Sequence, residues 1–106
     1  MSAAAEPLAE FSFEAEVVHW RGPSPYFFAP LPAQVAAEVR RLARAASYGW
    51  GVIPVDARIG EVDFTTSLFP RQETYYLPLK DVVRRKANVT AGDVVSAEMT
   101  VRLGRR

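Results

Sequence analysis

The chain contains no cysteine and only one histidine among its 106 residues. Disulfide bonds and metal sites with cysteine ligands are therefore excluded. No apolar run approaches the roughly 20 residues of a membrane-spanning helix, and the first ten residues lack the basic and apolar parts of a secretory signal. We expect no metal, no cofactor and no membrane partner. The absence of cysteine fits a reducing cytoplasm, where we expect the protein to be.

A strong excess of charge of either sign is also missing. Thirteen basic and twelve acidic residues leave a net charge of +1. Because proteins that bind nucleic acid usually show a clear basic excess, the composition disfavours a nucleic-acid partner. The basic residues are nevertheless crowded into residues 80–86 and into the last five residues.

The length and composition predict a single globular domain. Hydrophobic residues make up 49% of the chain and charged residues 24%, which is ordinary for a soluble protein. Residues 1–10 are rich in Ala, Pro and Glu, so we expect a flexible N-terminal tail. Residues 11–103 then form the domain, and residues 104–106 form a frayed end.

Alternation of apolar and polar residues predicts about six strands. These are residues 11–17, 26–29, 55–59, 62–68, 75–77 and 94–103, with Gly60 opening a tight turn between two of them. Apolar residues at helical spacing predict helices over residues 32–46 and 79–87, the second ending at Asn88 and the first at Gly49. Alternation also predicts that Tyr75 and Tyr76 point to opposite sides, so that at most one lies in the core.

The fold class that follows is mainly β (α+β). Short strands that bend at proline and glycine are typical of barrels. We therefore predict a small closed or partly open β-barrel of about six strands with two short helices.

Nine short motifs occur in one order along the chain, and together they resemble domain-of-unknown-function family 1905, a set of small bacterial proteins. The resemblance covers residues 11–103 and implies a small β-barrel with two helices, but no established activity. Many relatives have glycine before the tyrosine of the short strand, where this chain has Glu73-Thr74, so we expect a different loop after Pro70. The motifs are Phe11-Ser12-Phe13-Glu14-Ala15, Tyr26-Phe27-Phe28, Leu31-Pro32, Gly49-Trp50-Gly51-Val52, Arg58-Ile59-Gly60, Thr66-Ser67-Leu68-Phe69-Pro70, Leu77-Pro78-Leu79-Lys80, Val83-Arg84 and Gly92-Asp93.

A looser resemblance covers only the C-terminal third. Leu77-Pro78, Val83-Arg84 and Gly92-Asp93-Val94 are similar to the half-barrel motif of AbrB/MazE-type swapped-hairpin regulators. In that class, two chains together form a barrel that binds DNA. Here the motif occurs once, and the strands before it could complete a barrel within one chain. Because of this partial motif and the basic residues at 80–86, a DNA-binding or antitoxin-like regulator is an alternative function.

The candidate ligand-binding site is a cluster of anion-binding groups. Lys80 and Arg84 lie one helical turn apart, and we place Arg71 with the hydroxyl groups of Thr66 and Ser67 near them. Guanidinium, ammonium and hydroxyl groups are suitable donors to a phosphate or carboxylate. The competing interpretation is a solvated helix face whose arginine stems cover apolar surface.

No pattern predicts catalytic residues. The single histidine, His19, has no recognisable partner, and the carboxylates are scattered over polar faces. Five aromatic residues offer a groove on which bases could stack, or alternatively a core and its rim, and we assign them to the core and its rim (Tyr26, Phe27, Trp50, Tyr75 and Tyr76).

The sequence thus predicts a non-enzymatic binding module for an unknown ligand or protein, with an anionic ligand as a candidate. We expect a monomer or a weak homodimer. A nucleic-acid partner is disfavoured, and a small-molecule enzyme ranks last.

Overall fold

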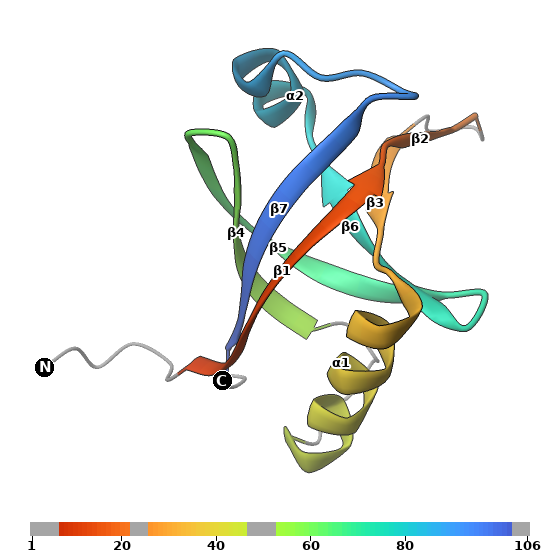
Figure 1. Cartoon of the computed structure of the whole chain (residues 1–106), viewed down its shortest axis with the longest axis vertical. Coiled ribbons are helices and arrows are strands. Elements are labelled where there is room, and N and C mark those ends of the chain that lie inside the picture. Colours follow the sequence, from red (N-terminus) through yellow and green to blue (C-terminus); the bar gives the residue numbers. More distant parts are fainter. Residues whose placement is uncertain (1–6, 22–25, 47–52, 103–106) are drawn as a thin grey trace, which may run out of the picture.

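The computed structural model describes residues 7–21, 26–46 and 53–102 (Figure 1). Within these ranges no helix is both long and apolar enough to cross a membrane. The elements follow in the order β1 (Pro7–Glu16), β2 (Val18–Trp20), β3 (Tyr26–Pro30), α1 (Ala33–Ala46), β4 (Ile53–Ile59), β5 (Val62–Arg71), β6 (Thr74–Leu79), α2 (Asp81–Ala87) and β7 (Val94–Arg102).

The seven strands form one antiparallel sheet in the order β1-β7-β4-β5-β6-β3-β2. The sheet curls into a partly open barrel, and the predicted fold class is confirmed (Figure 1). β1 and β2 lie at the two edges of the sheet, although they are neighbours in the chain. A single segment therefore spans the seam of the barrel.

The break at Val17 explains why the described strands number seven and not six. We expected one strand over residues 11–17 continuing towards Trp20. The N–H of Val17 instead donates to the carbonyl of Asp93 (2.8 Å), and its own carbonyl accepts from the N–H of Gly92 (2.9 Å). Before Val17 the chain pairs with β7, and after it the chain pairs with β3. The remote turn before β7 thus divides the strand.

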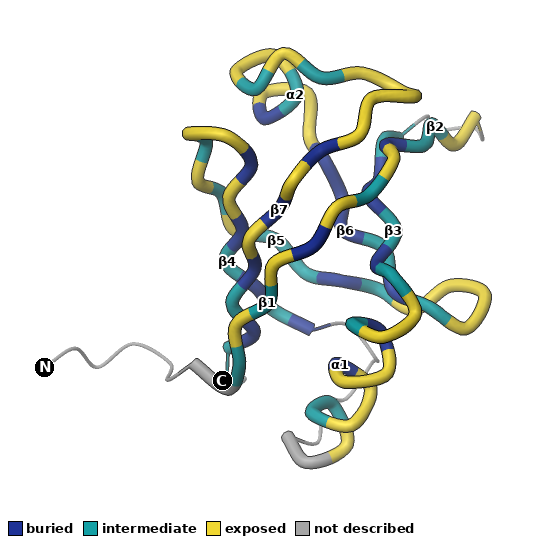
Figure 2. The backbone as a smooth tube through the Cα atoms, viewed as in Figure 1, coloured by how far each residue is buried: buried dark blue, intermediate teal, exposed yellow. Residues whose placement is uncertain are grey.

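The core fills the inside of the barrel. Every second residue of β4 and β7 is buried, and the residues between them are partly or fully exposed (Figure 2). Ala36 and Val39 of α1 belong to the same core. The predicted pair of tyrosines is confirmed, because Tyr75 lies in this core and Tyr76 does not. Full burial of an aliphatic side chain contributes about 1.5–3 kcal/mol.

Several predicted boundaries differ from the structure, and two of the differences concern the ends of the tail and of the second helix. β1 begins at Pro7, so residues 7–10, which we assigned to the tail, extend the strand and pair with the end of β7. Proline is tolerated at the first residue of an edge strand. α2 begins at Asp81 and not at residue 79, because Leu79 still pairs with Phe27 in the sheet. The helix end predicted at Gly49 lies outside the described residues.

Three turns have the chemistry that the sequence indicates. Asn88 ends α2 in the left-handed conformation (φ 60°), and Gly60 (φ 61°) opens the β4–β5 turn. The carboxylate of Asp93 accepts from the N–H of Thr90 (2.9 Å), as expected for a residue that stabilises its own turn. In the β5–β6 turn, Gln72 (φ 52°) and Glu73 (φ 70°) adopt the conformation that glycine favours. The loop after Pro70 thus keeps a glycine-like backbone without glycine.

Candidate functional site

The outer surface of the barrel divides into two halves of different chemistry. The first half covers β1, β7, β4 and the start of β5, and we call it the polar half. Its exposed side chains include several carboxylates and few cations. Outward-facing positions of β1 supply Glu10, Glu14 and Glu16, and an outward-facing position of β7 supplies Glu98.

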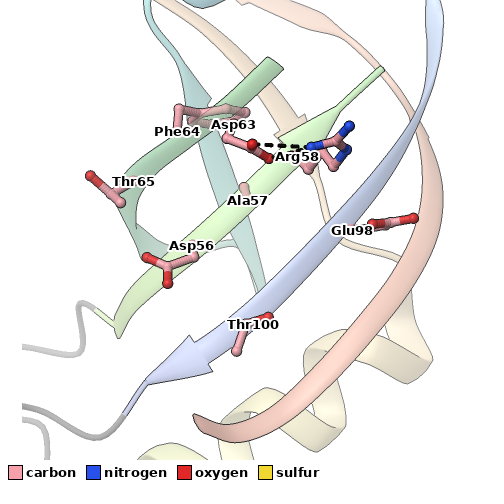
Figure 3. A pocket seen from close by; sticks show the side chains of 8 residues that line it. All are labelled: Asp56, Ala57, Arg58, Asp63, Phe64, Thr65, Glu98 and Thr100. Atoms are coloured by element: carbon pink, nitrogen blue, oxygen red, sulfur yellow. Dashed lines mark hydrogen bonds and ion pairs between the residues drawn. The ribbon is translucent and has the colours of Figure 1, made fainter. Parts of the chain in front are cut away.

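A shallow hollow of about 460 Å³ lies in the polar half, over β4, β5 and β7 (Figure 3). Its charged groups are largely paired with one another or with close neighbours. Arg58 donates to both carboxylate oxygens of Asp63 (2.9 and 3.0 Å), and Arg102 donates to Asp56 (2.7 Å). Within the described ranges, no three His, Asp or Glu residues are arranged to hold a metal ion. The hollow is therefore a surface of neutralised ion pairs.

The second half covers the outer side of β6, β3, β2 and the end of β5, and we call it the aromatic half. Three rings gather there around Phe28. The ring centre of Phe28 lies 5.2 Å from that of Tyr26, 5.2 Å from that of Phe69 and 5.3 Å from that of Tyr76. The Phe69 and Tyr76 rings, which come from paired residues, are 6.0 Å apart.

The Phe28 cluster lies outside the core of the barrel. Phe28 is only 6% exposed, yet it is not part of the core cluster, to which its neighbour Ala29 belongs. Successive residues of a strand point to opposite sides, so Phe28 points outward as Ala29 points inward. The sheet is thus apolar on both sides here. One side of an antiparallel sheet commonly faces water. An outer side that carries apolar rings, as this one does, indicates an interaction site.

An exposed cation and an exposed ring meet across the aromatic half. The guanidinium carbon of Arg71 lies 5.9 Å from the ring centre of Trp20, which is 42% exposed. Trp20 pairs with Tyr26, next to the end of β6, whereas Arg71 pairs with Thr74 at the start of β6. Both side chains point outward, so they extend along the face towards each other. We call them the open pair.

Lys80 adds a second cation at the edge of the aromatic half. It is exposed, and it lines a small hollow of about 290 Å³ together with Tyr26, Phe27 and Asp81. It is also the N-cap residue of α2, where its side chain makes no capping hydrogen bond. Its ammonium group is therefore not used to stabilise the helix.

Arg84 has a different environment from the other cations of the predicted cluster. Its guanidinium carbon lies 3.6 Å from the ring centre of Phe27, and its Nη2 donates to Asp81 (2.5 Å). Only 19% of its side chain is exposed. His19 stacks on the same ring, with centres 4.3 Å apart. Two groups this close cannot share one face of a ring, so His19 and Arg84 lie on opposite faces of Phe27.

The five residues of the predicted anion cluster have different environments in the structure. Thr66 pairs with the inward-pointing Val55, whereas Ser67 is its neighbour in β5 and points outward. Arg84 contacts Phe27 and Asp81, while Arg71 and Lys80 lie at the aromatic half. Anion binding by these residues stays a prediction, and we centre it on Arg71 and Lys80.

The sequence reasoning missed Trp20, Phe28 and Phe69 as possible site residues. The sequence contained one sign of this cluster, because Tyr26 and Phe28 are two residues apart in a predicted strand and so lie on the same side of it. The order of the strands was not available. Only that order brings Phe28 beside Tyr76 and Phe69.

The protein is a small, partly open antiparallel barrel that has, besides its core, a cluster of aromatic rings on its outer surface. A model of the family described as "Domain of unknown function (DUF1905)" matches residues 13–99, and the chain belongs to this family. No curated protein is similar enough to the chain to count as a match. The family assignment defines the fold and no activity, so a function has to be argued from the surface.

Proposed function

We propose that the protein is a non-enzymatic binding module that holds an anionic ligand with a flat ring against its aromatic half. The observation that carries the proposal is the open pair, an exposed guanidinium above an exposed indole. An indole face attracts cations and stacks with flat rings, and a guanidinium group pairs with carboxylate or phosphate. One ligand with a ring and a negative charge can engage both.

The chemistry of the aromatic half favours binding over catalysis. The groups around Phe28 and the open pair are aromatic rings, phenol hydroxyls and a guanidinium group, which suit stacking and charge pairing. The hollow of the polar half holds two ion pairs, between Arg58 and Asp63 and between Arg102 and Asp56. Neither half combines an activated nucleophile with a general base.

A titration with three small probes tests this proposal. Phenyl phosphate has both the ring and the charge, cyclohexyl phosphate lacks the flat ring, and phenol lacks the charge. We expect NMR titration to give the lowest Kd for phenyl phosphate, with the other two roughly fivefold weaker, the loss that corresponds to about 1 kcal/mol of stacking or charge pairing. The amide signals that move should belong to β2, β3, β5 and β6.

The matched variants are Arg71→Ala and Arg58→Ala, because both remove an exposed arginine from the outer surface. Arg71→Ala should make phenyl phosphate no better than phenol, and Arg58→Ala should leave its binding unchanged. Equal binding of all three probes, or signals that move mainly in the polar half, would refute the proposal.

A further inference from the structure

The two halves of the surface differ in charge as well as in apolarity. The exposed cations that the structure places on the aromatic half are Arg71 and Lys80. Its acidic groups are Glu73 and Asp81, of which Asp81 is paired with Arg84. Exposed carboxylates lie mainly on the opposite side, along β1 and β7. The net charge of +1 therefore hides a separation that favours a polyanion on the aromatic half.

The aromatic half is wide enough for a ligand with several linked rings, and not only for a ligand with one ring. Its rings come from β2, β3, β6 and β5, four consecutive strands of the sheet. Three spacings between strands make a platform roughly 14 Å across. Bases that lie against such rings are splayed apart and not stacked on one another, so a four-stranded surface of this size is matched by about two or three bases.

The open pair has nearly the separation needed to enclose a base. Arg84 shows the distance of a closed contact, with its guanidinium carbon 3.6 Å from the ring centre of Phe27. The corresponding distance from Arg71 to Trp20 is 5.9 Å. A base stacked on both groups needs about 7 Å, or two stacking distances. Since both side chains are long and exposed, a shift of about 1 Å in their separation admits it.

From these observations we infer that the aromatic half binds single-stranded nucleic acid, with one base enclosed between Arg71 and Trp20. The rings around Phe28 stack with further bases, and Lys80 lies where the phosphates pass. Sheet surfaces that present aromatic rings bind single strands in this way, because every base offers a flat face. A duplex hides those faces, so it is not the expected ligand. This inference rests on the proposed function and names its ligand.

The experiment uses the full chain and fluorescence polarisation with labelled oligouridylate and oligothymidylate of two, four and eight nucleotides, and with a duplex. We expect affinity to rise from two to four nucleotides, because about two or three bases cover the platform, and then to level off. Two cations at the phosphates, Arg71 and Lys80, predict that raising salt from about 50 to about 200 mM weakens binding roughly sevenfold. The ribose and deoxyribose arms reveal whether the 2′-hydroxyl contributes.

Four substitutions test the enclosed base. Trp20→Leu should weaken binding roughly 5- to 150-fold, the range for losing one stacked base, and Trp20→Phe should weaken it less because a flat ring remains. Arg71→Lys should lie between wild type and Arg71→Ala, since it keeps the charge but loses the plane. Arg58→Ala is the control and should change nothing.

Each alternative outcome overturns the inference. If phenyl phosphate binds and no oligonucleotide does, the proposed function stands and nucleic acid is not the ligand. Duplex binding as tight as single-strand binding points to a regulator of double-stranded DNA. Binding of a proline-rich peptide without oligonucleotide binding assigns the face to a protein partner. If Arg71→Lys matches wild type, the guanidinium does not stack on a base.

Discussion

The guanidinium carbon of Arg84 lies 3.6 Å from the centre of the Phe27 ring, whereas that of Arg71 lies 5.9 Å from the centre of the Trp20 ring. Arg84 is largely buried and ion-paired with Asp81, and the Phe27 ring that it contacts packs against the core. Trp20 is 42% exposed and outside the core. The same two kinds of side chain thus form a closed pair and an open pair.

The two pairs show that the type of contact alone does not define a binding site. In the closed pair, the ring is covered on both faces by His19 and Arg84, so it has no surface left for a ligand. In the open pair, neither group reaches close contact with the other. We therefore expect the closed pair to contribute to stability and the open pair to binding, and the following substitutions test this division.

The largest effect is expected for Phe27→Ala. Phe27 packs against the core and carries a stacked group on each face, and loss of a buried phenylalanine ring costs about 3–5 kcal/mol. Because Phe27 is only partly buried, we expect a loss of about 3 kcal/mol in the free energy of unfolding, measured by urea denaturation. Trp20→Ala is the matched ring deletion in the open pair and should cost under about 1 kcal/mol. Equal losses would remove the distinction.

Arg84→Ala should have the second-largest effect. It removes a cation–π contact, an ion pair and an apolar stem, for a combined loss of about 1–2 kcal/mol in the free energy of unfolding. Its Nε is buried without a hydrogen-bond partner among the described residues, which offsets part of its contribution. Arg84→Met keeps the stem and removes that buried polar atom.

The order of the two Arg84 variants checks this reasoning. We expect Arg84→Met to cost about half as much as Arg84→Ala in the same denaturation experiment, because the stem still covers Phe27. Asp81→Asn removes only the ion pair and should cost less than about 0.5 kcal/mol. Equal losses for Arg84→Met and Arg84→Ala would show that the charge, and not the stem, holds α2 to the barrel.

Much of the fold could be predicted from the sequence because its strands carry strict alternation. The inward positions of β4 and β7, the opposite orientation of Tyr75 and Tyr76, and the turns at Gly60 and Asn88 all follow from local rules. The division of the first strand at Val17 does not, since it results from hydrogen bonds to Gly92 and Asp93. Local patterns contain no information about such remote partners.

The candidate site was harder to predict for the same reason. Arg84 has the helical spacing of a solvent-exposed residue, and only the position of α2 over Phe27 buries it. The rings of Phe28, Phe69 and Tyr76 lie in three separate segments of the chain. Strand order brings them together, and their composition alone suggested a core. Arg71 was identified from its chemistry, but its partner Trp20 was not.

The smallest effect on stability is expected for Arg71→Ala. Arg71 is exposed, and an exposed cation–π contact at 5.9 Å has little to lose, so the free energy of unfolding should change by less than about 0.5 kcal/mol. The same variant is the one predicted to weaken phosphate and oligonucleotide binding most clearly. Urea denaturation and fluorescence polarisation on one preparation separate the two effects. If Arg71→Ala destabilises the protein as much as Arg84→Ala, Arg71 holds the β5–β6 hairpin against Trp20, and the open pair is a structural contact like the closed one.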